Sequence, residues 1–188
     1  YRLGAGFDLP PLMFSQGEAN ALVAAARLAQ AWLDAGLARE VEMALGKILS
    51  VLPPAARVAA EAQALYAPSV GLDPRVQSHL QALREAVHSR HMVQIDYADV
   101  HGRPSLRRLR PLGCFYWGKV WTLSAWCELR NDFRGFRIDR IVGLVVLEEQ
   151  FRQEPGKTLA DLLRKVEAEM EVPPMRAGDA PGVPPATA

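Results

Sequence analysis

Two different spacings of apolar residues divide the chain near residue 91. Before that point apolar residues recur every three or four positions, as they do on one face of a helix. After it, Val93, Ile95 and Tyr97 alternate with polar residues, which is the pattern of a half-buried strand. The spacing therefore predicts an α+β fold in which a helical region comes first and a sheet follows.

The region from 15 to 91 is predicted to be helical. Ser15 and Glu18 have the spacing of a capping box, so a first helix is expected from there to about Trp32. Three more helices are expected: one that Pro53 ends, one from Pro54 to about Tyr66, and one that Asp73 and Pro74 open. The apolar stripes of the alanine-rich helices leave two interpretations open. The helices pair between two chains in a homodimer, or they pack against the chain's own sheet.

The region from 92 to 150 is predicted to hold five short antiparallel strands. Tight turns between them are typical of a small barrel. The strands are expected around Val93–Tyr97 and over Leu106–Tyr116, Val120–Cys127, Arg134–Arg140 and Val142–Glu149. The region from 151 to 171 should form a last helix capped by Thr158. Residues 1–14 have the composition of a connector, and the proline-rich segment 172–188 is predicted to be disordered.

Positive charge is concentrated in the middle of the chain. The net charge is only +1, yet residues 103–140 carry 9 basic and 3 acidic side chains. Three of the four tryptophans also lie between Arg107 and Ile141. Clustered arginines beside aromatic rings favour an anionic, planar ligand.

Several classes of function find no support in the sequence. The apolar runs are shorter than the roughly 18 to 20 residues of a membrane helix, and the two cysteines cannot form a metal or disulfide framework alone. His88 and His91 have helical spacing but lack a third metal ligand. Ser105 and Ser124 have no histidine and carboxylate at a supportive spacing. We therefore expect a cytoplasmic protein that is not an enzyme and has no cofactor, no metal and no membrane segment.

Several spaced motifs resemble the WYL domain of YafY-type bacterial transcriptional regulators. They are a strand ending in Tyr97, a turn with Gly102, the run Arg107–Leu112, the triplet Trp121-Thr122-Leu123 and the ending Arg134–Ile141. The resemblance implies an Sm-like or SH3-like barrel that binds a ligand and controls a winged helix-turn-helix domain. That DNA-binding domain is expected to precede Tyr1 and to bind operator DNA as part of a homodimer.

The sequence departs from the family pattern in two places. Thr122 stands where the family triplet has tyrosine, which removes a phenol able to stack or to donate a hydrogen bond. In addition, only about 40 residues follow the predicted barrel, so the chain resembles a short form without the C-terminal domain of longer relatives.

The candidate ligand site combines arginines with polar residues of the strands. Phe136 and Ile138 are expected in the core, so Arg137 should project outward, and with Arg107 on a neighbouring strand it could hold a phosphate. The competing interpretation is that Arg137 or Arg140 forms a salt bridge with a nearby carboxylate. Tyr116 and Trp117 are better placed than Trp121 to stack on a base. The predicted ligand-binding residues are Arg107, Arg110, Tyr116, Thr122, Ser124, Arg134, Arg137 and Arg140.

These observations and the resemblance together predict the effector-sensing part of a DNA-binding transcriptional regulator. Its ligand would be a small anion, a nucleotide or single-stranded nucleic acid. The alternatives are an Sm-like module that binds single-stranded nucleic acid as its end function, and an oligomerisation domain without a ligand.

Overall fold

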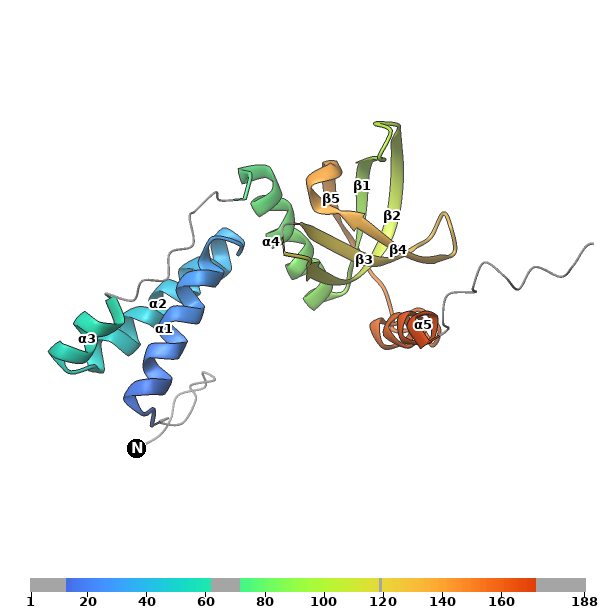
Figure 1. Ribbon diagram of the computed structural model, residues 1–188. Coiled ribbons are helices and arrows are strands. Elements are labelled where there is room, and N and C mark those ends of the chain that lie inside the picture. The colour runs from blue at the N-terminus through green and yellow to red at the C-terminus, as the bar shows by residue number, and fades with distance from the viewer. Residues whose placement is uncertain (1–12, 62–71, 119, 172–188) are drawn as a thin grey trace, which may run out of the picture. The chain divides into compact units, whose positions relative to one another are not determined.

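The computed structural model describes residues 13–61, 72–118 and 120–171 (Figure 1). The chain divides into two compact units, Tyr1–Ala82 and Leu83–Ala188. We describe each unit by itself. Residues 1–12 of the predicted connector and the whole predicted tail, 172–188, lie outside the described residues. The part of the third predicted helix beyond Glu61 also lies outside them. Among the described helices, none is long and apolar enough to cross a membrane.

The first unit is built from helices whose beginnings are fixed by local caps. It contains α1 (Gln16–Gln30), α2 (Ala35–Val51), α3 (Pro54–Glu61) and the beginning of α4 (Pro74–Ser89). The predicted capping box is confirmed, because the Glu18 N–H donates to the Ser15 hydroxyl while the Glu18 carboxylate accepts from the Ser15 N–H. Asp34 is the N-cap of α2, and its side chain accepts hydrogen bonds from the backbone N–H groups of Gly36 and Leu37 at 3.1 Å each.

The core of this helical unit is small. Val23, Leu45 and Ala60 form its buried centre. Several large apolar side chains of the same helices remain exposed; they are Leu22, Leu28, Met43, Val51 and Val58. Pairing of these helices between two chains stays a prediction.

The second unit contains one antiparallel sheet of five strands. They are β1 (His91–Ala98), β2 (Pro104–Tyr116), β3 (Trp121–Cys127), β4 (Asp132–Arg137) and β5 (Ile141–Gln150), in the spatial order β4-β3-β2-β1-β5. The predicted α+β class and the five strands are confirmed. The barrel is not closed, because β4 and β5 are the two edges of the sheet and do not pair with each other in the described residues.

The end of the fourth strand differs from the prediction. The strand stops at Arg137, and Ile138–Arg140 form a 3-10 helix, η1, in place of the predicted extension of β4. One tight turn carries the chain from β4 at one edge of the sheet to β5 at the other while Ile138 stays fully buried. Phe136 and Ile138 continue the alternation of apolar residues into this turn, so the pattern alone did not indicate that the strand ends at Arg137.

The sheet is nevertheless strongly curled. Tyr97 on β1 and Phe136 on β4 are separated by two strands, which in a flat sheet means about 14 Å. Their ring centroids lie 5.1 Å apart in an edge-to-face contact. The curl encloses an inner face whose core residues are Val93, Ile95, Leu109, Leu123, Ala125 and Phe136. The other surface of the sheet is called the outer face below.

The C-terminal helix α5 (Leu159–Glu171) begins at the predicted cap. The Asp161 N–H donates to the Thr158 hydroxyl at 3.2 Å, and the Asp161 carboxylate accepts from the Thr158 hydroxyl and backbone N–H. These hydrogen bonds from Thr158 lower the pKa of Asp161 to about 2. Further along α5, Lys165 contacts Asp132 at the start of β4 with a distance of 3.0 Å. The helix is thereby attached to one edge of the sheet.

A basic groove at the open end of the sheet

Strand β2 places Arg107 on the inner face. Ser105, Arg107 and Leu109 point to the same side of the strand, and Leu109 is fully buried in the core. Arg107 lies opposite Ile95, another buried core residue. Its guanidinium Nε donates a hydrogen bond to the Ser105 hydroxyl at 3.2 Å. Arg107 therefore lies on the same face of β2 as the core residue Leu109, two residues closer to the end of the sheet where the core ends.

Strand β4 places Arg134 on the same face. Arg134 pairs with Ala125 and Phe136 pairs with Leu123, and both partners on β3 are fully buried. The two arginines thus come from strands that are not neighbours, and the curl of the sheet brings them around one opening.

Two turns add further arginines to this opening. In an antiparallel meander the first and third turns lie at the same end, so the β1–β2 turn with Arg103 and the β3–β4 turn with Arg130 meet there. Together these elements enclose a groove of about 460 Å³, called the basic groove. Its lining consists of Tyr97, Asp99, Arg103, Pro104, Ser105, Arg107, Cys127, Arg130, Arg134 and Phe136.

The basic groove carries an excess of positive charge. Its lining includes four arginines and one carboxylate. That carboxylate, Asp99, forms a salt bridge with Arg103 at 2.7 Å. Hydrogen bonds from the Arg103 backbone and side chain, together with one from His101, lower the pKa of Asp99 to about 2. Arg134 contacts Asp132 at 3.3 Å, and Arg107 and Arg130 form no ion pair in the part of the chain that the structure describes.

The floor of the basic groove is apolar and aromatic. Tyr97 and Phe136 meet there edge to face, and Cys127 lies buried beside them. The Tyr97 hydroxyl accepts a long hydrogen bond from the Arg137 N–H at 3.4 Å, which holds the ring in place. Guanidinium groups around an aromatic floor can bind an anionic group that is joined to a flat, apolar part. Within the described ranges no three His, Cys, Asp or Glu side chains are grouped as a metal site would require.

Four of the eight predicted residues lie on the opposite surface. Arg110, Thr122, Ser124 and Arg137 all belong to the outer face, as their cross-strand pairs show. The predicted convergence of Arg107 and Arg137 does not occur, since β3 lies between their strands and their side chains are on different faces.

Arg137 is instead paired with a carboxylate of its own segment. Its guanidinium contacts the two oxygens of Asp139 at 3.1 and 2.7 Å. The hydrogen bond to Asp139 raises the pKa of Arg137, and the same bond lowers the pKa of Asp139. Of the two interpretations of Arg137, the one in which it forms a salt bridge with a nearby carboxylate therefore agrees with the structure.

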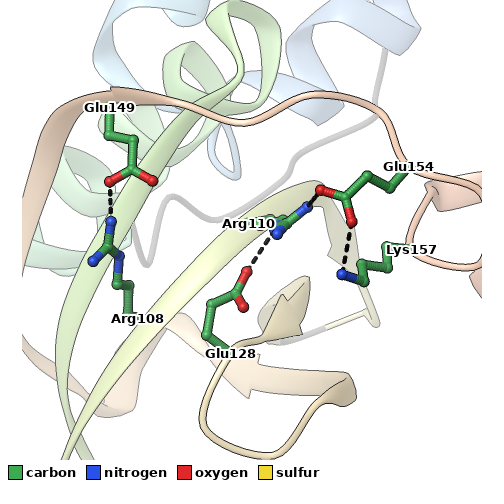
Figure 2. A network of polar contacts seen from close by, with 6 residues as sticks. All are labelled: Arg108, Arg110, Glu128, Glu149, Glu154 and Lys157. Atoms are coloured by element: carbon green, nitrogen blue, oxygen red, sulfur yellow. Dashed lines mark hydrogen bonds and ion pairs between the residues drawn. The ribbon is translucent and has the colours of Figure 1, made fainter.

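Arg110 belongs to an ion-pair network on the outer face (Figure 2). It contacts Glu128 at 2.5 Å and Glu154 at 2.6 Å, and Glu154 also contacts Lys157 at 2.7 Å. Hydrogen bonds from Lys157 and then Arg110 lower the pKa of Glu154 to about 2. The network joins β2, the β3–β4 turn and the segment before α5.

The depression beside this network is balanced in charge. Its lining contains three arginines and three glutamates, namely Arg108, Arg110, Arg152, Glu128, Glu149 and Glu154. Arg108 is paired with Glu149, so the pairing extends across the depression (Figure 2). An incoming anion would have to displace a carboxylate from Arg108 or Arg110. The basic groove is the better anion site for that reason.

The remaining two predicted residues do not line the basic groove. Arg140 follows η1. Tyr116 lies at the other end of β2, about 30 Å along the strand from Arg107, packed against Trp121 with its hydroxyl donating to the Gly118 carbonyl. Trp117 next to it is 72% exposed and stacks on Phe115.

The sequence reasoning missed Tyr97, Arg103 and Arg130 as groove residues. The available signal was topological: four consecutive antiparallel strands place their first and third turns at the same end, so charged residues in those turns had to be considered jointly. Arg107 and Arg134 are the two predicted residues that the structure brings to this site.

A match to a family model agrees with the resemblance seen in the sequence. Residues 78–146 match the family model of the WYL domain, a range that begins in α4 and ends in β5. Among solved structures, the chain is similar to proteasome accessory factor B/C (PafBC) of Arthrobacter aurescens, with 20% sequence identity and a TM-score of 0.40. That alignment covers 79% of this chain and 23% of the other, so the chain spans less than a quarter of the length of PafBC.

Proposed function

We propose that this chain, which contains a WYL domain at residues 78–146, is the effector-sensing part of a bacterial DNA-binding transcriptional regulator. Its ligand is a small anion or a nucleotide that binds in the basic groove. The observation that carries the proposal is the excess of guanidinium groups around an aromatic floor, at the end of the sheet where the β1–β2 and β3–β4 turns lie.

The arginines have different tasks in this proposal. Arg107 is positioned by Ser105 and is ready to accept an anion, because in the described chain it has no carboxylate partner. Arg134 turns from Asp132 toward the ligand and completes a two-sided contact. Binding that favours one of two conformations shifts the equilibrium between them, and the attached DNA-binding domain responds to that shift.

A titration with mononucleotides, read by calorimetry, tests the site. Loss of a hydrogen-bonded charge contact costs about 1.5–3 kcal/mol, so Arg107→Ala and Arg134→Ala should each weaken binding by about 10- to 150-fold. Arg137→Ala is the matched control, since it removes the same charge from the outer face. Binding that Arg137→Ala weakens as strongly as Arg107→Ala would contradict the proposed site.

A second function is favoured by one observation. The ring of Trp117 is 72% exposed and already stacked on Phe115, which is how a platform for nucleic-acid bases is built. An Sm-like module that binds single-stranded nucleic acid would use it. In that case affinity rises with oligonucleotide length, falls steeply with salt, and drops when Trp117 is replaced by alanine. Equal affinity for mononucleotides and oligonucleotides favours the sensor.

A further inference from the structure

Asp132, at the start of β4, contacts both the basic groove and the C-terminal helix. One oxygen of its carboxylate contacts Arg134, which lines the groove, at 3.3 Å. The other oxygen accepts a hydrogen bond from Lys165 of α5 at 3.0 Å. The side chain of Asp132 is more buried than that of either partner. One carboxylate therefore holds a groove arginine and α5 at the same time.

The two cations compete for this carboxylate. Like charges that share one opposite charge repel each other, so each weakens the attraction that the other feels. The hydrogen bond from Lys165 is the largest cause of the lowered pKa of Asp132, and the charge of Arg134 is a smaller cause. Lys165 is thus the stronger partner, and its hold on Asp132 should strengthen when Arg134 leaves.

The contacts that hold α5 on the sheet are few, so a change in one of them matters. None of residues 159–169, the part of α5 whose burial the structure describes, is buried. Leu163 and Val166 are 44% and 39% exposed. A helix of 13 residues is only marginally stable alone in water, so α5 depends on its contacts with the sheet.

We propose that ligand binding in the basic groove tightens the attachment of α5, and that the attached α5 in turn strengthens ligand binding. This inference rests on the proposed function of the groove. An anion that takes Arg134 from Asp132 leaves the carboxylate to Lys165. Coupling between two sites is reciprocal, so the same factor applies in both directions. For exposed ion pairs that factor is about 1.4 to 5.

The effect should be confined to the second half of α5. The beginning of the helix has anchors of its own, because Thr158 caps it and Glu154 of the preceding segment is bound to Arg110 on the outer face. Neither anchor contacts Asp132 or Arg134 in the part of the chain that the structure describes. Amides from Lys165 onward should therefore respond to the groove, while those just after Thr158 should not.

Hydrogen exchange of the α5 amides in the full chain tests the coupling without any ligand. Arg134→Ala removes the competitor for Asp132, as a bound anion would, so exchange from Lys165 onward should slow by about 1.4- to 5-fold. Lys165→Gln should speed it by a similar factor. In the Lys165→Gln background, Arg134→Ala should have no effect, because the two changes act through one carboxylate.

Arg164→Gln is the matched control for the helix. It removes the same charge from the neighbouring position, but the partner of Arg164 is Asp161 of α5 itself. Arg134→Ala should therefore slow the exchange of α5 in the Arg164→Gln background as much as in the natural chain. Thermal melts establish that each variant is folded.

A saturating mononucleotide provides the second arm of the test. It should slow exchange of the natural chain from Lys165 onward as Arg134→Ala does, and it should cause no further slowing in Arg134→Ala. The inference is overturned if Arg134→Ala leaves α5 exchange unchanged or speeds it, if the slowing survives Lys165→Gln, or if a mononucleotide binds in the groove without slowing α5. A mononucleotide that does not bind counts against the proposed function, and Arg134→Ala still decides the inference.

Discussion

Replacing Asp132 by asparagine is expected to tighten anion binding in the basic groove. Asp132 is the carboxylate that competes with a ligand for Arg134, at a distance of 3.3 Å. Its other oxygen accepts from Lys165 of α5 and from the Phe133 N–H. Asparagine has the same shape and can still accept the Phe133 hydrogen bond, but it carries no charge to hold Arg134.

The size of the effect follows from the exposure of the pair. The side chain of Arg134 is 53% exposed and that of Asp132 is 31% exposed, so water screens their attraction. Exposed pairs of this kind correspond to a factor of about 1.4 to 5 in an equilibrium constant, and Asp132→Asn should improve affinity by that factor. Lys165→Gln should have the opposite sign, because Asp132 would then attract Arg134 more strongly.

Calorimetric titration with a mononucleotide at low salt measures this change. Asp139→Asn is the matched control, because it removes the same charge but releases Arg137 on the outer face. Asp132→Asn should lose its advantage when Arg134 is already alanine. An equal gain from Asp139→Asn, or a gain that survives the loss of Arg134, would refute the assignment of Arg134 as a ligand contact.

Three further predictions concern the sheet and its surroundings. Leu123→Ala should lower the free energy of unfolding by about 2–5 kcal/mol in denaturant titrations, because Leu123 is fully buried, whereas Leu106→Ala at an exposed position should cost under about 0.5 kcal/mol. The contribution of the Glu154 carboxylate to the free energy of unfolding should be complete above pH 4.5 and lost as pH falls toward 2. Glu154→Gln should therefore make the free energy of unfolding depend less on pH between 4.5 and 2. Thr122→Tyr should leave nucleotide affinity unchanged in the same calorimetric titration.

The features of the fold that could be predicted are those that neighbouring residues determine. Ser15 with Glu18 and the cap at Thr158 depend on side chains three residues apart, and both are present. The end of β4 could not be predicted in this way. Alternation reports which residues are buried, and Ile138 is buried whether its backbone is a strand or a 3-10 turn. The curl of the sheet likewise depends on contacts between residues far apart in the sequence, such as Tyr97 and Phe136.

The candidate site was predicted only in part, because a strand pattern does not fix the register between strands. Within β2, the separation of Arg107 from Arg110 follows from odd and even positions beside the buried Leu109. That relation fails beyond Pro111, where the pairing of β2 with β3 shifts by one residue. The face on which Tyr116 lies therefore depends on a bulge that the sequence did not indicate.

The position of Thr122 decides what its difference from the family tyrosine means. Thr122 lies opposite Arg137 and Phe115 on the outer face, with its methyl group against Gly135. The sheet itself separates this position from Arg107, so a phenol here would not reach the basic groove. It would extend over a surface where Arg137 is already neutralised by Asp139. Arg107 and Arg134, which line the groove, both belong to the motifs that resemble the WYL domain, and it follows that the departure at Thr122 removes no group from the groove.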